Sequence, residues 1–522
     1  MGSLVLIIPV VDRGAGAFAI LVTGRSFERR RGAGHRPHTF MNSLRDHSFR
    51  FRSIDMVHGT GTRIPVVVLL ILLTVVMSGI AAGSPEEGAS IQASSQALES
   101  ENIQGTGLEN TSVSDGVSFV RLWNRLYGGD RDDVLSTVRK TPDGGFAAIG
   151  YTGSGYGQVT GNHGLHDIWV VRMRSDGTMM WGRCYGGSSY DYGSDIALAR
   201  DGGFVIAGYT MSDDGQAAVN HGGFDIWVAR IGPGGTIVWK RTIGGPGDDV
   251  PSAVIEDSDG NFVIYGETKS NIFGNHGNSD LFVIKLSKSG SILWKKCFGG
   301  TSWEYSPCGK ILQRQNGNYV FIGTTSSTGG QVDGFHGATD IWMGEVSRTG
   351  NLVWQHCFGG TGYDGGRGLA LDKTLDKGIV FGGYSSSDDG DVKANPGNSL
   401  WVVKLDVSRN ITWQRCIPGV DIYDIAQVSG GQYILAGAGC PAPGGGCMKG
   451  GTDGLMINLG KFGVVKAKRC LGGSGTDLVQ SVVPLNNGEF VVAGTTDSTD
   501  GYGTGNHGWR DAWIMKWRIQ PA

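Results

Sequence analysis

The sequence predicts an all-β protein, a seven-bladed β-propeller with four antiparallel strands in each blade. Glycine accounts for 90 of the 522 residues while hydrophobic residues still make up 39%, a combination too apolar for a disordered glycine-rich chain. A unit of roughly 57 residues recurs seven times, and fixed-period repetition is typical of propellers and solenoids. Each unit holds four short apolar runs bounded by turn residues, which favours strands over helices.

An uncharged apolar segment, residues 64–82, precedes the repeats. Arg63 lies before it and the small residues Gly79, Ala81 and Ala82 end it, the pattern of a signal peptide cleaved near Ala82. The segment is also just long enough to span a bilayer. We therefore predict that residues 56–83 form a signal peptide or transmembrane anchor, that the rest is extracellular or on the cell surface, and that only residues 64–82, if uncleaved, contact a membrane.

The segments on either side differ in composition. Residues 1–63 carry ten Arg and four acids, which fits poorly before a signal peptide, whereas Met56 would begin a conventional one. Residues 1–55 are predicted to be a misassigned extension or, if translated, a cytoplasmic Arg-rich segment. Residues 84–116 are rich in Ser, Gly and Glu and read as a flexible linker. The remaining chain is mildly acidic, which argues against nucleic acid as a partner.

The repeats occupy residues 117–519. Each is marked by an aromatic residue followed four positions later by an apolar residue and a Gly-Gly pair. The spacings between successive copies are 58, 58, 55, 60, 59 and 54 residues. The marker residues are Trp123, Trp181, Trp239, Trp294, Trp354 and Trp413, with Ala467 in the seventh copy.

Connection lengths within a unit set its topology. In the second unit the predicted strands are residues 193–199, 204–210, 225–231 and 236–242. Tight turns at residues 201–203 and 233–235 join the first two and the last two strands, which makes them antiparallel neighbours. The loop between the second and third strands is about 14 residues long. A solenoid is the alternative architecture, but units of four antiparallel strands favour closure into a ring.

The phase of the repeat indicates how the ring closes. The last unit ends with its third strand, residues 511–519, and an unpaired fourth-type strand, residues 117–126, precedes the first complete unit. We predict that this N-terminal strand completes the last blade, because such sharing removes an open sheet edge.

Two motifs carry a family resemblance. The turn from Thr349 to Trp354 (TGNLVW) resembles the TGxxxW turn of pyrroloquinoline-quinone-type propellers. The whole unit, over residues 117–519, is similar to secreted bacterial and archaeal propeller-repeat proteins with the pattern GGxxxD, DGGF, GYTxS and NHGxxDxWV. Some members of that class carry an endoglucanase-like label. The resemblance implies the fold, whereas propellers host binding, scaffolding and catalysis alike.

Acidic residues recur at two positions, on loops that the connection order places on one face. Four residues after the Gly-Gly pair stand Asp133, Asp191, Asp249, Glu304, Asp364 and Asp477, while the sixth unit departs with Tyr423 and Asp424. In the Asn-His-Gly loop stand Asp167, Asp225, Asp280, Asp340 and Asp511, with Asp453 in a degenerate copy. One interpretation is a ring of sugar or cation sites, with calcium as the candidate ion at Asp133, Asp191, Asp249, Asp364 and Asp477. The other, which presence in nearly every blade favours, is that these carboxylates accept backbone N–H bonds and hold the loops.

The same loops each contain a histidine, namely His163, His221, His276, His336 and His507. Together with their aspartates they are candidate binding residues on the long-loop face. Convergence on one metal ion is disfavoured, since each belongs to a different blade and no HxH or HExxH spacing occurs. Loop packing is the structural alternative. The third-strand aromatics also recur once per blade and are expected to pack between blades rather than stack on sugars; they are Trp169, Trp227, Phe282, Trp342, Trp401 and Trp513.

Five of the eight cysteines occupy one equivalent repeat position, where Leu126 and Thr242 stand in two other copies. This interchange predicts a small buried side chain and no disulfide for Cys184, Cys297, Cys357, Cys416 and Cys470. Cys440 and Cys447 differ, because they flank PAPGGG in the long loop of the sixth unit. A local disulfide between them is predicted outside the cell.

No catalytic constellation emerges from these patterns. The leading hypothesis is a non-enzymatic extracellular binding or cell-surface scaffold module whose partner is a glycan or protein, with calcium as the only cofactor that the sequence suggests. The second is a carbohydrate-active enzyme, an endoglucanase-like glycoside hydrolase, which needs two carboxylates about 5–9.5 Å apart. The third is a quinone-dependent oxidoreductase, and only the TGxxxW-like turn supports it. The dehydrogenases that this turn resembles typically have eight blades, so the seven units of this chain count against it.

Overall fold

The computed structural model describes residues 3–12, 16–25, 117–217, 219–371, 377–439 and 451–521. The chain divides into two units. In the first, β1 (Ser3–Asp12) and β2 (Gly16–Arg25) form an antiparallel hairpin. The predicted signal or anchor segment and the linker lie outside the described residues. Within the described part of the chain, no helix has the length and apolarity needed to cross a membrane.

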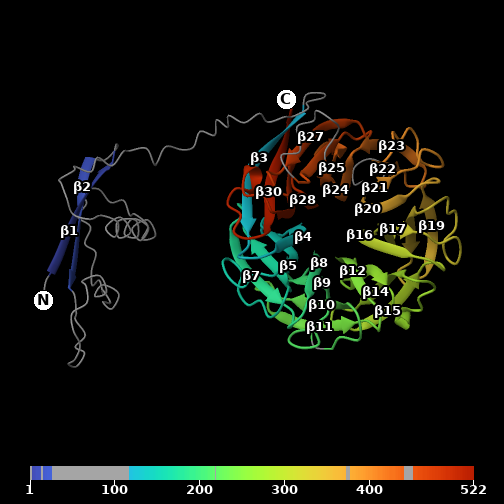
Figure 1. Cartoon of the computed structure of the whole chain (residues 1–522), viewed down its shortest axis with the longest axis horizontal. Coiled ribbons are helices and arrows are strands. Elements are labelled where there is room, and N and C mark those ends of the chain that lie inside the picture. Colours follow the sequence, from blue (N-terminus) through green and yellow to red (C-terminus); the bar gives the residue numbers. More distant parts are fainter. Residues whose placement is uncertain are drawn as a thin grey trace. The chain divides into compact units, whose positions relative to one another are not determined.

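The second unit is a ring of seven four-stranded antiparallel sheets, a seven-bladed β-propeller, as the sequence predicted (Figure 1). Blades one to three contain β4 (Asp133–Lys140), β5 (Phe146–Thr152), β6 (Asp167–Met173), β7 (Met179–Tyr185); β8 (Asp191–Leu198), β9 (Phe204–Thr210), β10 (Asp225–Ile231), β11 (Ile237–Ile243); and β12 (Asp249–Glu256), β13 (Phe262–Thr268), β14 (Asp280–Leu286), β15 (Ile292–Phe298). Blades four to six contain β16 (Glu304–Gln313), β17 (Tyr319–Thr325), β18 (Asp340–Val346), β19 (Leu352–Phe358); β20 (Asp364–Leu371), β21 (Ile379–Ser385), β22 (Ser399–Leu405), β23 (Ile411–Pro418); and β24 (Val420–Gln427), β25 (Tyr433–Gly439), β26 (Gly454–Leu459), β27 (Val465–Leu471). Blade seven contains β28 (Asp477–Pro484), β29 (Glu489–Thr496), β30 (Asp511–Pro521) and β3 (Val117–Tyr127).

Closure of the ring follows the prediction. The N-terminal strand β3 pairs antiparallel with the C-terminal strand β30, so blade seven takes its outer strand from the start of the ring's sequence. In blade two, β9 and β10 have the predicted bounds, and β8 and β11 differ from theirs by one or two residues. No blade is left with an incomplete sheet.

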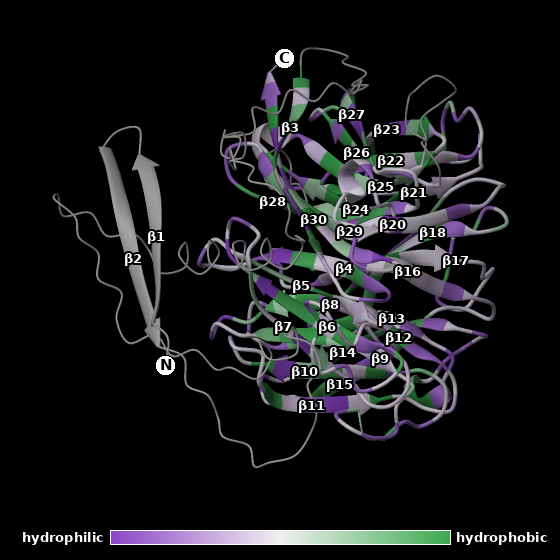
Figure 2. Cartoon of the chain, turned by 60° about the vertical axis from the view of Figure 1, so that its left-hand side comes forward, coloured by the Kyte–Doolittle hydropathy of each residue, from purple (hydrophilic) through white to green (hydrophobic). Residues whose placement is uncertain are grey.

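Hydrophobic side chains fill the spaces between neighbouring sheets. Ile149 of blade one, for example, belongs to the same core cluster as Ile206 and Trp227 of blade two. Figure 2 shows hydrophobic residues concentrated on inner strands and hydrophilic residues on many outer loops. The predicted packing role of the third-strand aromatics is confirmed, because all six are at most 1% exposed: Trp169, Trp227, Phe282, Trp342, Trp401 and Trp513.

A tryptophan on the outer strand of several blades joins it to the next blade. Trp239 of β11 lies against Gly290 in the turn between β14 and β15, where an added Cβ would stand 2.8 Å from the indole ring. Its Nε1 donates a hydrogen bond to the Lys288 carbonyl at 2.9 Å. Trp294 and Gly350 repeat the contact one blade on. The TGxxxW-like turn therefore forms a contact between blades, because its glycine, Gly350, leaves room for the indole of Trp294 in the preceding blade.

The first strand of each blade is its inner strand, which faces the central channel of the ring. Each of these inner strands contains a β-bulge, and a bulge changes the direction of the side chains beside it. In blade one Ser136 bulges out between Leu135 and Thr137. In blade four the bulge is larger: β16 has ten residues where β4 has eight, and the pairing jumps from Tyr305 to Lys310. Blade four thus presents additional chain to the central channel.

Candidate functional site

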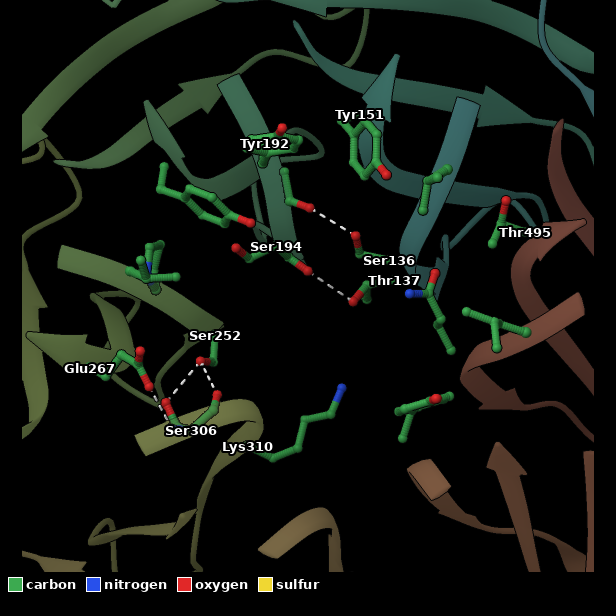
Figure 3. A pocket seen from close by; sticks show the side chains of 18 of the residues that line it. Ser136, Thr137, Tyr151, Tyr192, Ser194, Ser252, Glu267, Ser306, Lys310 and Thr495 are labelled. Atoms are coloured by element: carbon green, nitrogen blue, oxygen red, sulfur yellow. Dashed lines mark hydrogen bonds between the residues drawn. The ribbon is translucent and has the colours of Figure 1, made fainter. Parts of the chain in front are cut away.

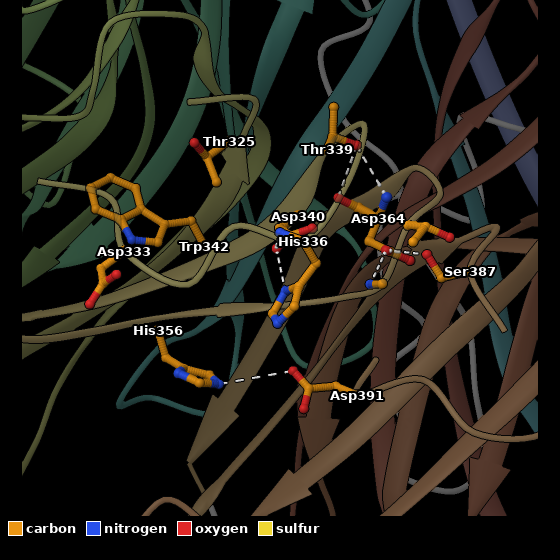
Figure 4. Close-up of polar contacts among 12 residues, drawn as sticks. Thr325, Asp333, His336, Thr339, Asp340, Trp342, His356, Asp364, Ser387 and Asp391 are labelled. Atoms are coloured by element: carbon orange, nitrogen blue, oxygen red, sulfur yellow. Dashed lines mark hydrogen bonds and ion pairs between the residues drawn. The ribbon is translucent and has the colours of Figure 1, made fainter. Parts of the chain in front are cut away.

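The Asn-His-Gly loops form a repeated clip. In each, the aspartate that begins the third strand accepts hydrogen bonds from the backbone N–H and the ring Nδ1 of the histidine four residues earlier. The ring distances are 2.5–2.7 Å. Figure 4 shows the copy at His336 and Asp340. The five histidines each bind an aspartate of their own loop, as the loop-packing interpretation expected: the pairs are His163–Asp167, His221–Asp225, His276–Asp280, His336–Asp340 and His507–Asp511.

The acids of the inner strands hold the loops between blades. Asp191 is 1% exposed, and its Oδ2 accepts bonds from the Gly187 N–H at 2.9 Å and the Ser212 hydroxyl at 2.8 Å. The same arrangement occurs at Asp364 with Ser387 (Figure 4). In blade six Val420 takes this place in the strand pairing. Framework donors thus bond to the Oδ2 of each carboxylate, whereas the Oδ1 of Asp191 and of Asp364 is buried without a hydrogen-bond donor among the described residues.

The two acid positions meet at the blade junctions. The Oδ1 of Asp167 and the Oδ2 of Asp191 both lie within 3.0 Å of the point where a Cβ on Gly186 would stand. The Oδ1 of Asp167 is buried and has no hydrogen-bond donor among the described residues. Burial and the neighbouring carboxylates raise the pKa of Asp133 and of Asp167 to about 6.

Calcium at these acids stays a prediction. A junction such as that of Asp167 and Asp191 supplies two carboxylates beside a glycine, whereas Ca²⁺ takes six to eight oxygen ligands. The junction between blades five and six has Ser399 and Val420 at these positions instead. Within the described residues, no three or more Asp, Glu, His or Cys side chains are placed to hold one metal ion.

The cysteine prediction holds in part. Cys184, Cys297 and Cys357 are buried free thiols, and Cys416 is a half-buried one. It is wrong for Cys470 on β27, which is disulfide-bonded: the position recurs in other blades, but blade six carries additional cysteines that they lack. Cys440 and Cys447 lie outside the described residues, so their predicted pairing stays a prediction.

A cavity of about 490 Å³ lies at the central channel, among inner strands of six blades (Figure 3). Hydroxyl groups line much of it: Ser136, Thr137, Ser194, Ser252, Ser306 and Thr495. Several of them bond between blades, as where the Ser136 hydroxyl donates to the Gly193 carbonyl at 2.9 Å. The cavity is therefore polar and joined across blade boundaries.

Aromatic residues of blades one and two form one wall of the cavity. The ring of Tyr192 lies 4.9 Å from that of Tyr151 and 5.2 Å from that of Tyr209, between centroids. The Tyr192 hydroxyl contacts His166 Nδ1 at 3.0 Å. Tyr190, 37% exposed, stacks parallel to Tyr192 at 6.1 Å. These rings continue from the cavity to the solvent, and we call them, with His166, the tyrosine wall.

The protonation states of the tyrosine wall are set by burial. Desolvation raises the pKa of Tyr192 and of Tyr209 to about 12 and raises that of Tyr151. It lowers the pKa of His166. At neutral pH Tyr151, Tyr192, Tyr209 and His166 are therefore uncharged.

Charged groups of blades three and four lie on another side of the cavity. Glu267 accepts a hydrogen bond from the Ser306 N–H at 2.9 Å, and burial raises its pKa. The Ser252 hydroxyl donates to the Ser306 carbonyl at 2.6 Å. Lys310, at the end of the enlarged bulge, also lines the cavity.

A second cavity of about 180 Å³ shares Tyr305 with the first. Arg367 and Asp421 line it and form an ion pair at 3.2 Å. The guanidinium also lies 5.4 Å from the centroid of Tyr423. The two cavities are thus adjacent, and Tyr363 and Tyr384 add aromatic surface to the second.

The cavity residues stand at repeat positions that change from blade to blade. The residue after the inner-strand acid is Val134, Tyr192, Val250, Tyr305, Gly365, Asp421 or Leu478. Sequence reasoning missed Tyr151, Tyr192, Tyr209, Glu267 and Lys310, because it ranked residues by recurrence. The signal that could have found them is the opposite one: variable positions next to recurrent ones on the first and second strands of each blade.

No protein-family model matches the chain, and no curated protein matches it. Solved structures that resemble it include a protein of unknown function from Bacteroides caccae (14% identity, 62% of this chain and 93% of that chain covered, TM-score 0.33). Sqt1 from Chaetomium thermophilum (10%, 71% and 83%, 0.39) and a gluconolactonase from Xanthomonas campestris (8%, 77% and 100%, 0.33) also resemble it. At such identities and TM-scores these matches say nothing about activity.

Proposed function

We propose that this protein is a non-enzymatic glycan-binding propeller of the cell exterior, with the channel cavity as its binding site. The tyrosine wall is the observation that carries the proposal. Aromatic rings with polar groups pack against the C–H face of a sugar while their hydroxyls bond to its hydroxyl groups. A concave site with aromatic lining and a few convergent polar groups is the ordinary form of a small-ligand site.

The placement of the wall supports a role in recognition. Tyr151, Tyr192 and Tyr209 occupy inner positions where other blades have Val250, Thr324 or Thr495. Such substitutions leave the framework of the blade unchanged, so the tyrosines are not needed for the fold. Residues that a fold does not need, gathered around one cavity, are best explained by what the cavity binds.

The carboxylates favour binding over hydrolysis. Glycoside hydrolysis generally needs two carboxyl groups across the scissile bond. Of the residues that line the larger cavity, Glu267 is the one carboxylate. Asp421, in the smaller cavity, is engaged by Arg367. The recurrent aspartates are held by the loops described above.

Two features support an exported location. The apolar segment at residues 64–82 has the composition of a signal peptide or anchor. The disulfide at Cys470 fits an oxidising compartment, since disulfides are rare in the cytosol.

The test is a glycan array followed by calorimetric titration of the hits, using residues 117–522, a ring that contains all seven core clusters. Binding that Tyr192→Ala weakens at least tenfold, with no release of reducing ends, is the expected result. Release of reducing ends that Glu267→Gln abolishes would establish a glycoside hydrolase instead. Repeating the titration with EDTA tests the calcium prediction, because calcium in the acidic loops would make binding or stability sensitive to the chelator.

A further inference from the structure

Lys310 reaches the cavity because blade four departs from the repeat. In blade one, Thr137 pairs with Ile149 just after a one-residue bulge. In blade four, Lys310 pairs with Ile322 at the same point, after a longer bulge. Figure 3 shows its side chain extending into the cavity. A long cationic side chain thus stands where blade one has a short hydroxyl.

The ammonium group of Lys310 lacks a hydrogen-bond acceptor among the described residues. The side chain is 15% exposed, and its ion-pair partner, the Oδ1 of Asp424, is 3.7 Å away, beyond hydrogen-bonding distance. Asp424 is already engaged: its Oδ1 accepts from the Ile425 N–H at 3.0 Å, and its Oδ2 from the Val482 N–H at 3.1 Å. The side chain is largely buried while its ammonium reaches the cavity, so a ligand oxygen there can accept its unused N–H donors.

The cavity lining has two cations, Lys310 and Arg510, and one acid, Glu267. Each cation also has an acidic neighbour outside the lining: Arg510 pairs with Asp132 at 3.9 Å and Lys310 with Asp424 at 3.7 Å. Burial raises the pKa of Glu267. The chain as a whole carries a formal charge of −3 in spite of its Arg-rich N-terminus. Of the two cations, Lys310 extends into the cavity (Figure 3) with ammonium donors that no described residue accepts, and such a group is complementary to an anionic ligand.

We infer that the cavity selects an anionic saccharide, whose carboxylate or sulfate group binds the Lys310 ammonium while a sugar ring packs on the tyrosine wall. The inference rests on the proposed function, because it assigns the ligand class of the same site. Lys310 supplies the charge selectivity, and Tyr192 supplies affinity for any sugar that fits.

The experiment compares three ligands by calorimetric titration of the ring: a galacturonate tetramer, the same tetramer with its carboxyl groups reduced to alcohols, and a sulfated glucan tetramer. The two anionic tetramers distinguish a carboxylate from a sulfate ligand. At least one is expected to bind about tenfold more tightly than the reduced tetramer, and added salt should narrow that difference.

Variants identify the group responsible. Lys310→Gln is expected to lower the affinity for the preferred anion about tenfold and to lower that for the reduced tetramer much less, and Lys310→Arg should restore most of the loss. Lys296→Gln, the same charge change on the exposed strand β15, is the matched control and should have no effect. Circular dichroism and a thermal melt check that each variant is folded.

The outcomes separate this inference from the proposed function. If the acidic and reduced tetramers bind equally well and Tyr192→Ala abolishes the binding of both, the preference for an anionic ligand is overturned but the glycan site is supported. Anion binding unaffected by Lys310→Gln would overturn the role of Lys310. Failure of every saccharide to bind would overturn both.

Discussion

The blade junctions and the channel cavity are built from neighbouring residues of the same strands, yet they differ in one respect. At the junctions the same side chains recur, as in the contact of Asp167 and Asp191 around Gly186. At the cavity, one residue further along the strand, Tyr192 replaces the valine found in blades one and three. The residues that recur in most blades are those that close the ring. The residues that differ between blades are those that distinguish this propeller from another. The junctions should therefore control stability, and the cavity should control binding.

The largest effect is expected at a junction glycine. In Gly186→Ala the added Cβ would lie 2.5 Å from the Asp191 Oδ2 and 3.0 Å from the Asp167 Oδ1. Both carboxylates are buried and bonded, so relief requires the junction to open, at a cost of about 1–3 kcal/mol or more. Chemical denaturation measures the free energy of unfolding.

The matched control for that variant is Gly234→Ala. Gly234 lies in the turn between β10 and β11, and a Cβ there would meet nothing within 4 Å. Its stability should stay within about 0.5 kcal/mol of the parent. Equal effects of the two substitutions would show that the junction is not close-packed.

The next effect concerns binding. Tyr192→Ala removes the ring that contacts both Tyr151 and Tyr209, and a loss of about 1.4 kcal/mol corresponds to a tenfold weaker affinity. Calorimetric titration with the glycan hit measures it. Tyr156→Ala, in a solvent-exposed loop of blade one (76% exposed), should bind as the parent does. If Tyr156→Ala weakens binding and Tyr192→Ala does not, the site lies on the loops and not in the channel.

The fold could be predicted closely because it depends on features that repeat. Each blade supplies the pattern again, so a degenerate copy such as Ala467 does not obscure it. The shared blade followed from the phase of the repeat, and the pairing of β3 with β30 confirms it. Errors appeared where one blade behaves individually: Cys470 forms a disulfide although its equivalents Cys184 and Cys297 are free thiols.

The candidate site could not be predicted in the same way. Tyr151 precedes both Glu267 and Lys310 by more than a hundred residues of sequence, and only ring closure brings their blades around one channel. The register shift that aims Lys310 inward depends on the length of the β16 bulge, and a sequence pattern does not give the direction of a bulged side chain. Variation between repeats would identify these positions, but it would not show that they line one cavity.

A smaller effect should separate the two regions by pH. Burial raises the pKa of Asp133 and of Asp167 to about 6 in the folded chain, above the ordinary value near 4 of the unfolded chain. The folded state therefore binds more protons between these values, and stability rises as the pH falls from 7 to 5. The expected gain is on the order of 1 kcal/mol per group. Thermal melts across this range measure it.

Asp133→Asn is the control for the pH effect, since it removes one titrating carboxyl from the junction. Its melting temperature should depend less on pH than that of the parent. The salt-bridged Asp143 does not interfere, because its pKa is lowered to about 2 and it stays ionised over this range. A melting temperature that decreases as the pH is lowered from 7 to 5 would contradict raised pKa values at the junctions.

The smallest effect is expected at the loop histidines, where it decides between the two regions most directly. His163 is about 40% exposed, and its ring bonds only to Asp167 among the described residues. His163→Ala leaves Asp167 the backbone N–H of the same residue, so the loss should be about 0.5 kcal/mol, the lower end for a single hydrogen bond. Because this clip recurs in five blades, it should contribute nothing to glycan affinity. Calorimetric titration of His163→Ala and His221→Ala with the glycan tests this. Unchanged affinity would support a binding site in the channel. A tenfold loss would place the site on the long-loop face, with the recurrent residues and not the variable ones as the ligand contacts.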